Sequence, residues 1–174
     1  MRAKVRILIL SLAAAAALVP ACLAYAEDNS GLSKEQSGAI SQSCDSIKQS
    51  LKKLQKADTK TRSYLGSLYE VFLTDFISPL NLRLVKNGLP STALTELHSS
   101  IIAGRQDFAK KFTLYAQDFE TLLNTDCQSN PAGFYKQLQT TRKSRAALEQ
   151  STEAMRMLLE KHQTAVQSLK GSLL

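Results

Sequence analysis

The chain has 174 residues, 22 Lys and Arg against 15 Asp and Glu, a net charge of +7 and three cysteines. This length corresponds to one domain, and 44% hydrophobic with 21% charged residues excludes an intrinsically disordered chain. After the first 26 residues, no apolar stretch is long enough to predict a membrane-spanning helix.

The first 26 residues have the plan of a secretory signal peptide. Three basic residues precede an apolar stretch over 7–19, and Ala24 and Ala26 stand where signal peptidase requires small residues. Two alternatives stay open, namely an uncleaved membrane anchor and a lipoprotein signal with a lipid on Cys22. We expect a secreted or cell-envelope protein that is cleaved near Ala26.

Cleavage after Ala26 would leave 148 residues with a net charge of +4, because it removes three basic residues and no acid. It would also leave two cysteines, Cys44 and Cys127. Exported proteins can form disulfides, so we expect these two to pair, the alternative being two buried thiols. Residues 27–33 are polar and predict a flexible N-terminus, and 34–174 predicts a single helical domain.

The region 34–78 predicts the first long helix. Its apolar residues alternate steps of four and three, which is typical of a helix packed in a left-handed bundle. The stripe comprises Ile40, Cys44, Ile47, Leu51, Leu54, Leu65, Leu68, Phe72 and Phe76, and Asp58 interrupts it. Pro79 is expected to end or kink this helix, and a short helical connection follows near 80–87.

Two further helices are predicted over 92–124 and 131–170. Ser91 or Thr92 can cap the former, and Asn130 caps the latter with Pro131 at its first position. Both carry apolar residues at heptad spacing. Three long helices with short connections predict an all-α, elongated antiparallel three-helix bundle.

An antiparallel order brings the start of the first helix, at Cys44, beside the end of the second, at Cys127. In the same register Asp58 falls level with Arg145. We interpret this pair as an ion pair that fixes the register, the alternative being a site for an anionic group.

His98, His162 and Asp75 fall at similar heights in this register. Two imidazoles and a carboxylate are a donor set that Zn²⁺ accepts, so a metal site is an alternative here. The structural interpretation is one half-buried histidine and one exposed histidine.

Catalytic and cofactor motifs are missing from the sequence. It contains no CxxC, GxSxG, HExxH, P-loop or GxGxxG pattern. The sequence therefore predicts no catalytic residue, no enzyme and no cofactor.

Basic residues recur every fourth position at Lys48, Lys52 and Lys56. They could form a basic face for an anionic lipid or polymer, the alternative being an ordinary solvated face. Aromatic residues are not interleaved with them, which argues against nucleic acid as a partner.

The connection over 77–89 is unusually apolar. Its candidate contact residues are Leu80, Leu82, Leu84, Val85 and Leu89. They predict a contact region for a partner, the alternative being a cap over the open end of the core.

Segments at 44–47, 62–66, 79–85, 126–127 and 134–135 read CDSI, RSYLG, PLNLRLV, DC and FY. In these segments the chain resembles uncharacterised exported helical proteins of small-genome candidate-phylum bacteria, over most of the mature chain. The resemblance implies a bacterial source and an envelope or extracellular location, and it carries no known activity.

The functional expectation is a non-enzymatic structural or interaction protein of the cell envelope or extracellular space, with an unknown protein or envelope component as partner. The alternative is a carrier of a small ligand or metal within the bundle. Contact with a membrane is expected only through the signal peptide or a lipid at Cys22.

Overall fold

The computed structural model describes residues 31–89 and 91–173, and helices form almost all of that part of the chain. No strand occurs in these two ranges, so the predicted all-α class is confirmed. In chain order the elements are α1 (Lys34–Gln42), α2 (Cys44–Val71), the π-helix η1 (Phe72–Ile77), α3 (Ser78–Lys86), α4 (Thr92–Asn124) and α5 (Pro131–Ser172).

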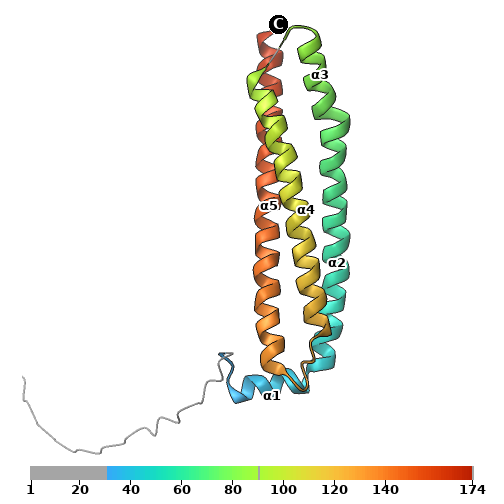
Figure 1. The fold of residues 1–174 in the computed structure, drawn as a ribbon, viewed down its shortest axis with the longest axis vertical. Helices are drawn as coiled ribbons and strands as arrows, with labels where there is room; N and C mark the ends of the chain where they lie inside the picture. Colours follow the sequence, from blue (N-terminus) through green and yellow to red (C-terminus); the bar gives the residue numbers. More distant parts are fainter. Residues whose placement is uncertain (1–30, 90, 174) are drawn as a thin grey trace, which may run out of the picture.

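Helix α4 is the central element of the packing. It contacts α5 along their shared length, and it also contacts α2, η1 and α3, which follow one another along one side of the molecule (Figure 1). Within the described ranges, no Cα atom of α5 comes within 8 Å of a Cα atom of α2, η1 or α3. Two helices in close contact have axes about 8–10 Å apart, and some of their Cα atoms then come within about 8 Å of each other. Helix α5 is therefore held away from the α2–η1–α3 row.

The prediction of one continuous first helix over 34–78 is wrong, because the helix is interrupted near its lower end. Ser43 separates α1 from α2, and α1 lies across the lower end of the long helices (Figure 1). The Ser41 hydroxyl donates to the Gln128 carbonyl oxygen at 3.1 Å, and Ile40 packs on the cluster around the two cysteines. Helix α1 therefore covers the end of the core instead of lengthening the bundle.

The described end of the segment 27–33 is packed and capped. Leu32 is only 4% exposed, and the Ser33 hydroxyl accepts a hydrogen bond from the Gln36 N–H at 3.2 Å while the Gln36 side chain accepts one from the Ser33 N–H. This arrangement is a capping box, which starts a helix. Residues 27–30, the expected signal peptide over 1–26 and Cys22 lie outside the described residues.

No helix in the described part of the chain combines the length and the apolar content that a membrane crossing requires.

The α2–η1–α3 row, called the first rod below, does not end at Pro79. In η1 the N–H groups bond to carbonyls five residues back, as Ser78 does to Leu73. Pro79 then lies in the first turn of α3, where its missing N–H costs little. The wide π-helical turn just before the proline lets the chain continue to Lys86 in place of the expected end.

The π-helix also changes which residues of this rod are buried. The heptad stripe predicts Phe72 and Phe76 in the core, but they are 43% and 60% exposed, whereas Tyr69, Leu73 and Ile77 are buried. A π-helical turn contains more residues than an α-helical turn, so residues four apart stay on one face. The buried series follows that spacing, and the two phenylalanines turn outward.

Helices α4 and α5 follow the ranges predicted for them. The Ser91 hydroxyl accepts from the Leu94 N–H at 3.3 Å, and the Asn130 side chain accepts from the Gly133 N–H at 2.9 Å; α5 continues to Ser172. Buried side chains on these two helices are Leu94, Ile101, Phe108, Tyr115, Phe119, Leu122, Phe134, Leu148 and Met155.

Cys44 and Cys127 lie at disulfide-bonding distance. Their Sγ atoms are 1.97 Å apart and their Cα atoms 5.5 Å apart. Cys44 is the first residue of α2 and Cys127 lies in the turn between α4 and α5. The pair therefore ties the lower end of the first rod to the connection between the other two long helices.

Candidate functional site

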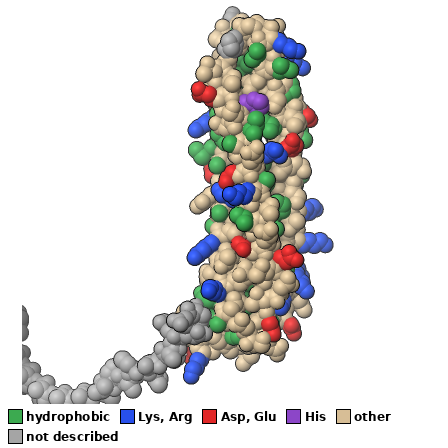
Figure 2. Space-filling view, in the orientation of Figure 1, with side chains coloured by type: hydrophobic (Ala, Val, Ile, Leu, Met, Phe, Trp, Pro, Cys, Tyr) green, Lys and Arg blue, Asp and Glu red, His purple; other side chains and the backbone are tan. Residues whose placement is uncertain are grey.

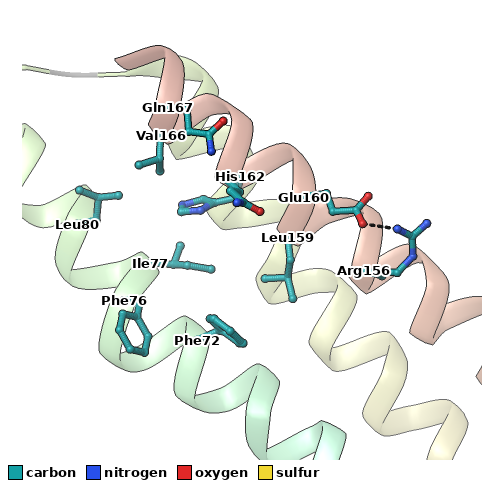
Figure 3. Close-up of a pocket in the computed structure, with 11 residues that line it drawn as sticks. Phe72, Phe76, Ile77, Leu80, Arg156, Leu159, Glu160, His162, Val166 and Gln167 are labelled. Carbon is teal, nitrogen blue, oxygen red and sulfur yellow. Dashed lines mark hydrogen bonds and ion pairs between the residues drawn. The ribbon is translucent and has the colours of Figure 1, made fainter. Parts of the chain in front are cut away.

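An apolar groove lies between η1 and α3 on one side and the C-terminal half of α5 on the other (Figure 3). Its volume is about 560 Å³. It is lined by Phe72, Phe76, Ile77, Leu80, Arg156, Leu159, Glu160, His162, Gln163, Val166 and Gln167. It occupies the upper part of the open side, where α5 is held away from the first rod.

The wall on η1 exists because the π-helix turns two aromatic rings outward. The ring centroids of Phe72 and Phe76 are 5.9 Å apart, with their planes tilted by 46°. Ile77, at the end of η1, is 2% exposed and belongs to both the core and the groove. This wall is the aromatic side of the groove.

The wall on α5 comes from residues at helical spacing. Leu159, His162 and Val166 follow at intervals of three and four, which places them on one face of a helix. Figure 3 shows these three side chains projecting toward Ile77 and Leu80. This wall is mainly aliphatic, with one imidazole within it.

His162 is a polar group among these apolar side chains. Its Nε2 atom is buried and finds no hydrogen-bond partner among the described residues. Burial lowers the pKa of this imidazole below its ordinary value, and the neighbouring His98 lowers the pKa further. The neutral form is therefore favoured in the folded protein.

The structure does not assemble the metal site that was an alternative for His98, His162 and Asp75. His98 Nε2 lies 3.0 Å from the Ser78 hydroxyl, and the Asp75 carboxylate accepts from the Thr74 hydroxyl at 2.9 Å. Residues 31–89 and 91–173 contain no group of three His, Cys, Asp or Glu that could hold a metal ion. The two histidines are neighbours, and Asp75 is not their third ligand.

Charges at the groove's lower end are compensated locally. Arg156 pairs with Glu153 and Glu160 on its own helix. Its hydrogen bond to Glu153 is the main cause that raises the pKa of the guanidinium, and it lowers the pKa of the Glu153 carboxyl. The arginine therefore offers no unpaired positive charge to the groove.

Further down the open side, polar side chains bridge α2 to α5. The structure brings Asp58 and Arg145 together, with Arg145 Nε 3.0 Å from Asp58 Oδ2, and the Tyr115 hydroxyl donates to the same oxygen at 2.6 Å. Arg62 donates to the Thr152 hydroxyl at 3.2 Å. These bridges span a gap that the backbones leave open, and their residues lie below those that line the groove.

Tyr115 is the member of this network that the sequence did not indicate. Burial raises the pKa of its hydroxyl, and the hydrogen bond to Asp58 raises that pKa further. The same carboxylate, through its hydrogen bond, raises the pKa of the Arg145 guanidinium. Asp58 thus joins all three long helices, consistent with a structural ion pair.

Replacing Tyr115 by Phe should lower the free energy of unfolding by about 1.5 kcal/mol, because it removes a hydrogen bond to a charged acceptor. Urea denaturation measures the change. Tyr64→Phe is the matched control, since Tyr64 is 64% exposed and its replacement should have little effect. Equal stability of the two variants would contradict a stabilising role of the Tyr115 hydroxyl.

The residues of the predicted basic face stay at the surface of α2. Lys52 and Lys56 are exposed and Lys48 is partly buried. Figure 2 shows basic side chains spread along the length of the visible face and interspersed with acidic ones. That distribution favours the solvated-face interpretation on this side of the molecule.

The predicted contact region over 77–89 is divided. Leu84 is 8% exposed and packs inward, so its assignment to a contact surface is wrong. Leu80 lines the groove. Leu82, Val85 and Leu89 are 56%, 65% and 39% exposed at the tip. The helical period separates these residues, because neighbours in sequence point to different faces.

Comparisons of this chain with protein-family models, with curated proteins and with solved structures find no match. Function is therefore inferred from the geometry of the chain's own residues.

Proposed function

We propose that this protein is a non-enzymatic binding module and that the groove is its binding surface. The observation that carries the proposal is the outward turn of Phe72 and Phe76 at η1, which builds an apolar wall opposite Leu159 and Val166. Contiguous exposed apolar surface is typical of interaction sites. The volume of about 560 Å³ is also in the usual range for small-molecule sites.

The proposed scaffold is an elongated antiparallel three-helix bundle, formed by the α2–η1–α3 row, α4 and α5. The position of the Cys44–Cys127 pair at one end supports that order. We propose that the protein is exported to the cell envelope or extracellular space of a bacterium. The signal-peptide pattern over 1–26 and a disulfide of the kind found in oxidising compartments support this location.

A second candidate is an interaction module that binds a protein or envelope component through the tip. The exposed apolar residues Leu82, Val85 and Leu89 favour it. The groove and the tip can be separated by substitution, because different residues form them.

Binding of Nile red, an uncharged apolar dye whose fluorescence rises in apolar surroundings, tests the groove. We expect Phe76→Asp to weaken the binding about tenfold, because it removes an apolar contact and adds a charge to the wall. Leu114→Asp is the matched control, since Leu114 is 48% exposed on α4 and does not line the groove.

Val85→Asp places the same change at the tip. If this variant loses the dye while Phe76→Asp keeps it, the tip is the binding surface and the groove is not. Equal dye binding by wild type and Phe76→Asp would also contradict the proposal.

A further inference from the structure

We propose that the groove binds an uncharged, ring-containing apolar molecule that carries one hydroxyl or carbonyl group. This inference rests on the proposed function and names the ligand class of the same groove.

The size of the groove favours a small molecule over a second copy of the chain. Along α5 the lining extends from Arg156 to Gln167, which is about 17 Å of helix. A stable protein interface buries about 800 Å² on each partner, more than a groove of this length provides. Below the groove, the Arg62–Thr152 bridge and the Asp58–Arg145 pair join α2 to α5.

The walls suit a flat ring system. Phe72 and Phe76 present two neighbouring phenyl rings on one side, and Leu159 and Val166 present aliphatic side chains on the other. Aromatic rings gain energy from offset or edge-to-face contacts with other rings. A molecule of a few fused rings can contact both walls within about 560 Å³.

The charges around the groove favour an uncharged ligand. On α5, Arg156 is compensated by Glu153 and Glu160, and burial lowers the pKa of His162, which favours its neutral form. His98, on α4, lies near His162 and forms a hydrogen bond with Ser78 of α3. An ionised ligand would lose its hydration here without gaining an unpaired opposite charge among these groups.

His162 is the reason to expect one hydrogen-bonding group on the ligand. Its Nε2 atom is buried without a partner among the described residues, and a buried polar atom is stabilised when it gains one. A neutral imidazole can donate or accept at this nitrogen, so a hydroxyl or a carbonyl oxygen can supply the partner after a small turn of the ring.

Four probes on one ring system test the ligand class, namely pyrene, pyrenemethanol, pyrenecarboxylate and pyrenemethylammonium. Their fluorescence is titrated with the full chain in its disulfide-bonded form. We expect pyrenemethanol to bind most tightly and both charged probes to bind at least about tenfold more weakly. Charged probes that bind as tightly as pyrenemethanol would overturn the proposal.

His162→Leu tests the hydrogen bond separately. The variant should bind pyrenemethanol about threefold to tenfold more weakly, because one neutral hydrogen bond is lost, and should bind pyrene as well as wild type does. His98→Leu, the matched control, should change neither affinity by more than about twofold, since His98 does not line the groove. An unchanged affinity of His162→Leu for pyrenemethanol would overturn the role of His162.

These results also separate the two proposals. If Nile red requires Phe76 but pyrenemethanol is not preferred over the charged probes, the groove binds ligands and the ligand class is wrong. If neither Nile red nor any pyrene probe depends on Phe76, the proposed function itself fails.

Discussion

Replacing both Cys44 and Cys127 by Ser should lower the free energy of unfolding by about 4.5 kcal/mol from loop closure alone. The two cysteines are 83 residues apart in sequence, so the bond removes much of the conformational freedom of the unfolded chain. Urea denaturation of the wild type and the double variant, both lacking the predicted signal peptide, measures the difference. Strain or residual structure in the unfolded chain reduces the value, and native disulfides of small secreted domains typically contribute about 2–5 kcal/mol.

Reductant provides the control for this prediction. It should destabilise the wild type by a similar amount and leave the double variant unchanged. A wild type whose unfolding midpoint is insensitive to reductant would show that the two thiols are not bonded in the protein, despite their placement in the structure.

Phe108→Ala should be the most destabilising single substitution that we consider, at about 3–5 kcal/mol. Phe108 is 2% exposed on α4. Its ring lies edge-to-face with that of Tyr69 at 5.2 Å and approaches the backbone of α2 at Gly66, where an added Cβ would be 3.5 Å from the ring. Truncation therefore empties a space that α2 and α4 share and cannot close easily.

Leu114→Ala on the same helix is the control, because Leu114 is 48% exposed and a surface change of this kind should stay within about 0.5 kcal/mol. Urea denaturation compares the two. A Phe108→Ala variant as stable as Leu114→Ala would contradict the central position of α4 between the first rod and α5.

The long helices α4 and α5 could be predicted from sequence because their local signals and their packing agree. Ser91 and Asn130 are capping residues that act as caps, and the apolar residues recur with the period of the helix. Asp58 and Arg145 could also be paired in advance, because two polar interruptions at one height of a bundle seam have few other partners. Tyr115 could not be added to them, since a tyrosine on an apolar stripe is typical of any core.

The first rod shows where the sequence pattern stops being sufficient. A heptad stripe continues through Ser43 and through 72–77, yet the chain turns at the former and widens into a π-helix at the latter. The turn at Ser43 depends on tertiary contacts of α1 with Gln128 and α5. In the π-helix, residues four apart stay on one face. Leu73 and Ile77 are therefore buried, and Phe72 and Phe76 are exposed, contrary to the heptad stripe.

The groove depends on the outward turn of Phe72 and Phe76 in η1, and no short sequence motif predicts it. Its residues come from two segments about 80 residues apart, and sequence periodicity places its aromatic members in the core. Pro79 is the one local signal for an irregular turn, because it makes a regular helix unfavourable just there. His162 was predicted at one height of the bundle, on the apolar line of its helix, but not as a residue of this wall.

The most direct test of the groove as a binding surface is photolabelling with benzophenone, an uncharged ring compound that inserts into nearby C–H bonds under ultraviolet light. Tryptic digestion and mass spectrometry locate the label. We expect adducts in the peptides that cover 63–83 and 157–170, and their loss when excess Nile red competes. Labelling concentrated in 87–105 or 112–136, or labelling that Nile red does not reduce, would contradict the groove as the binding surface.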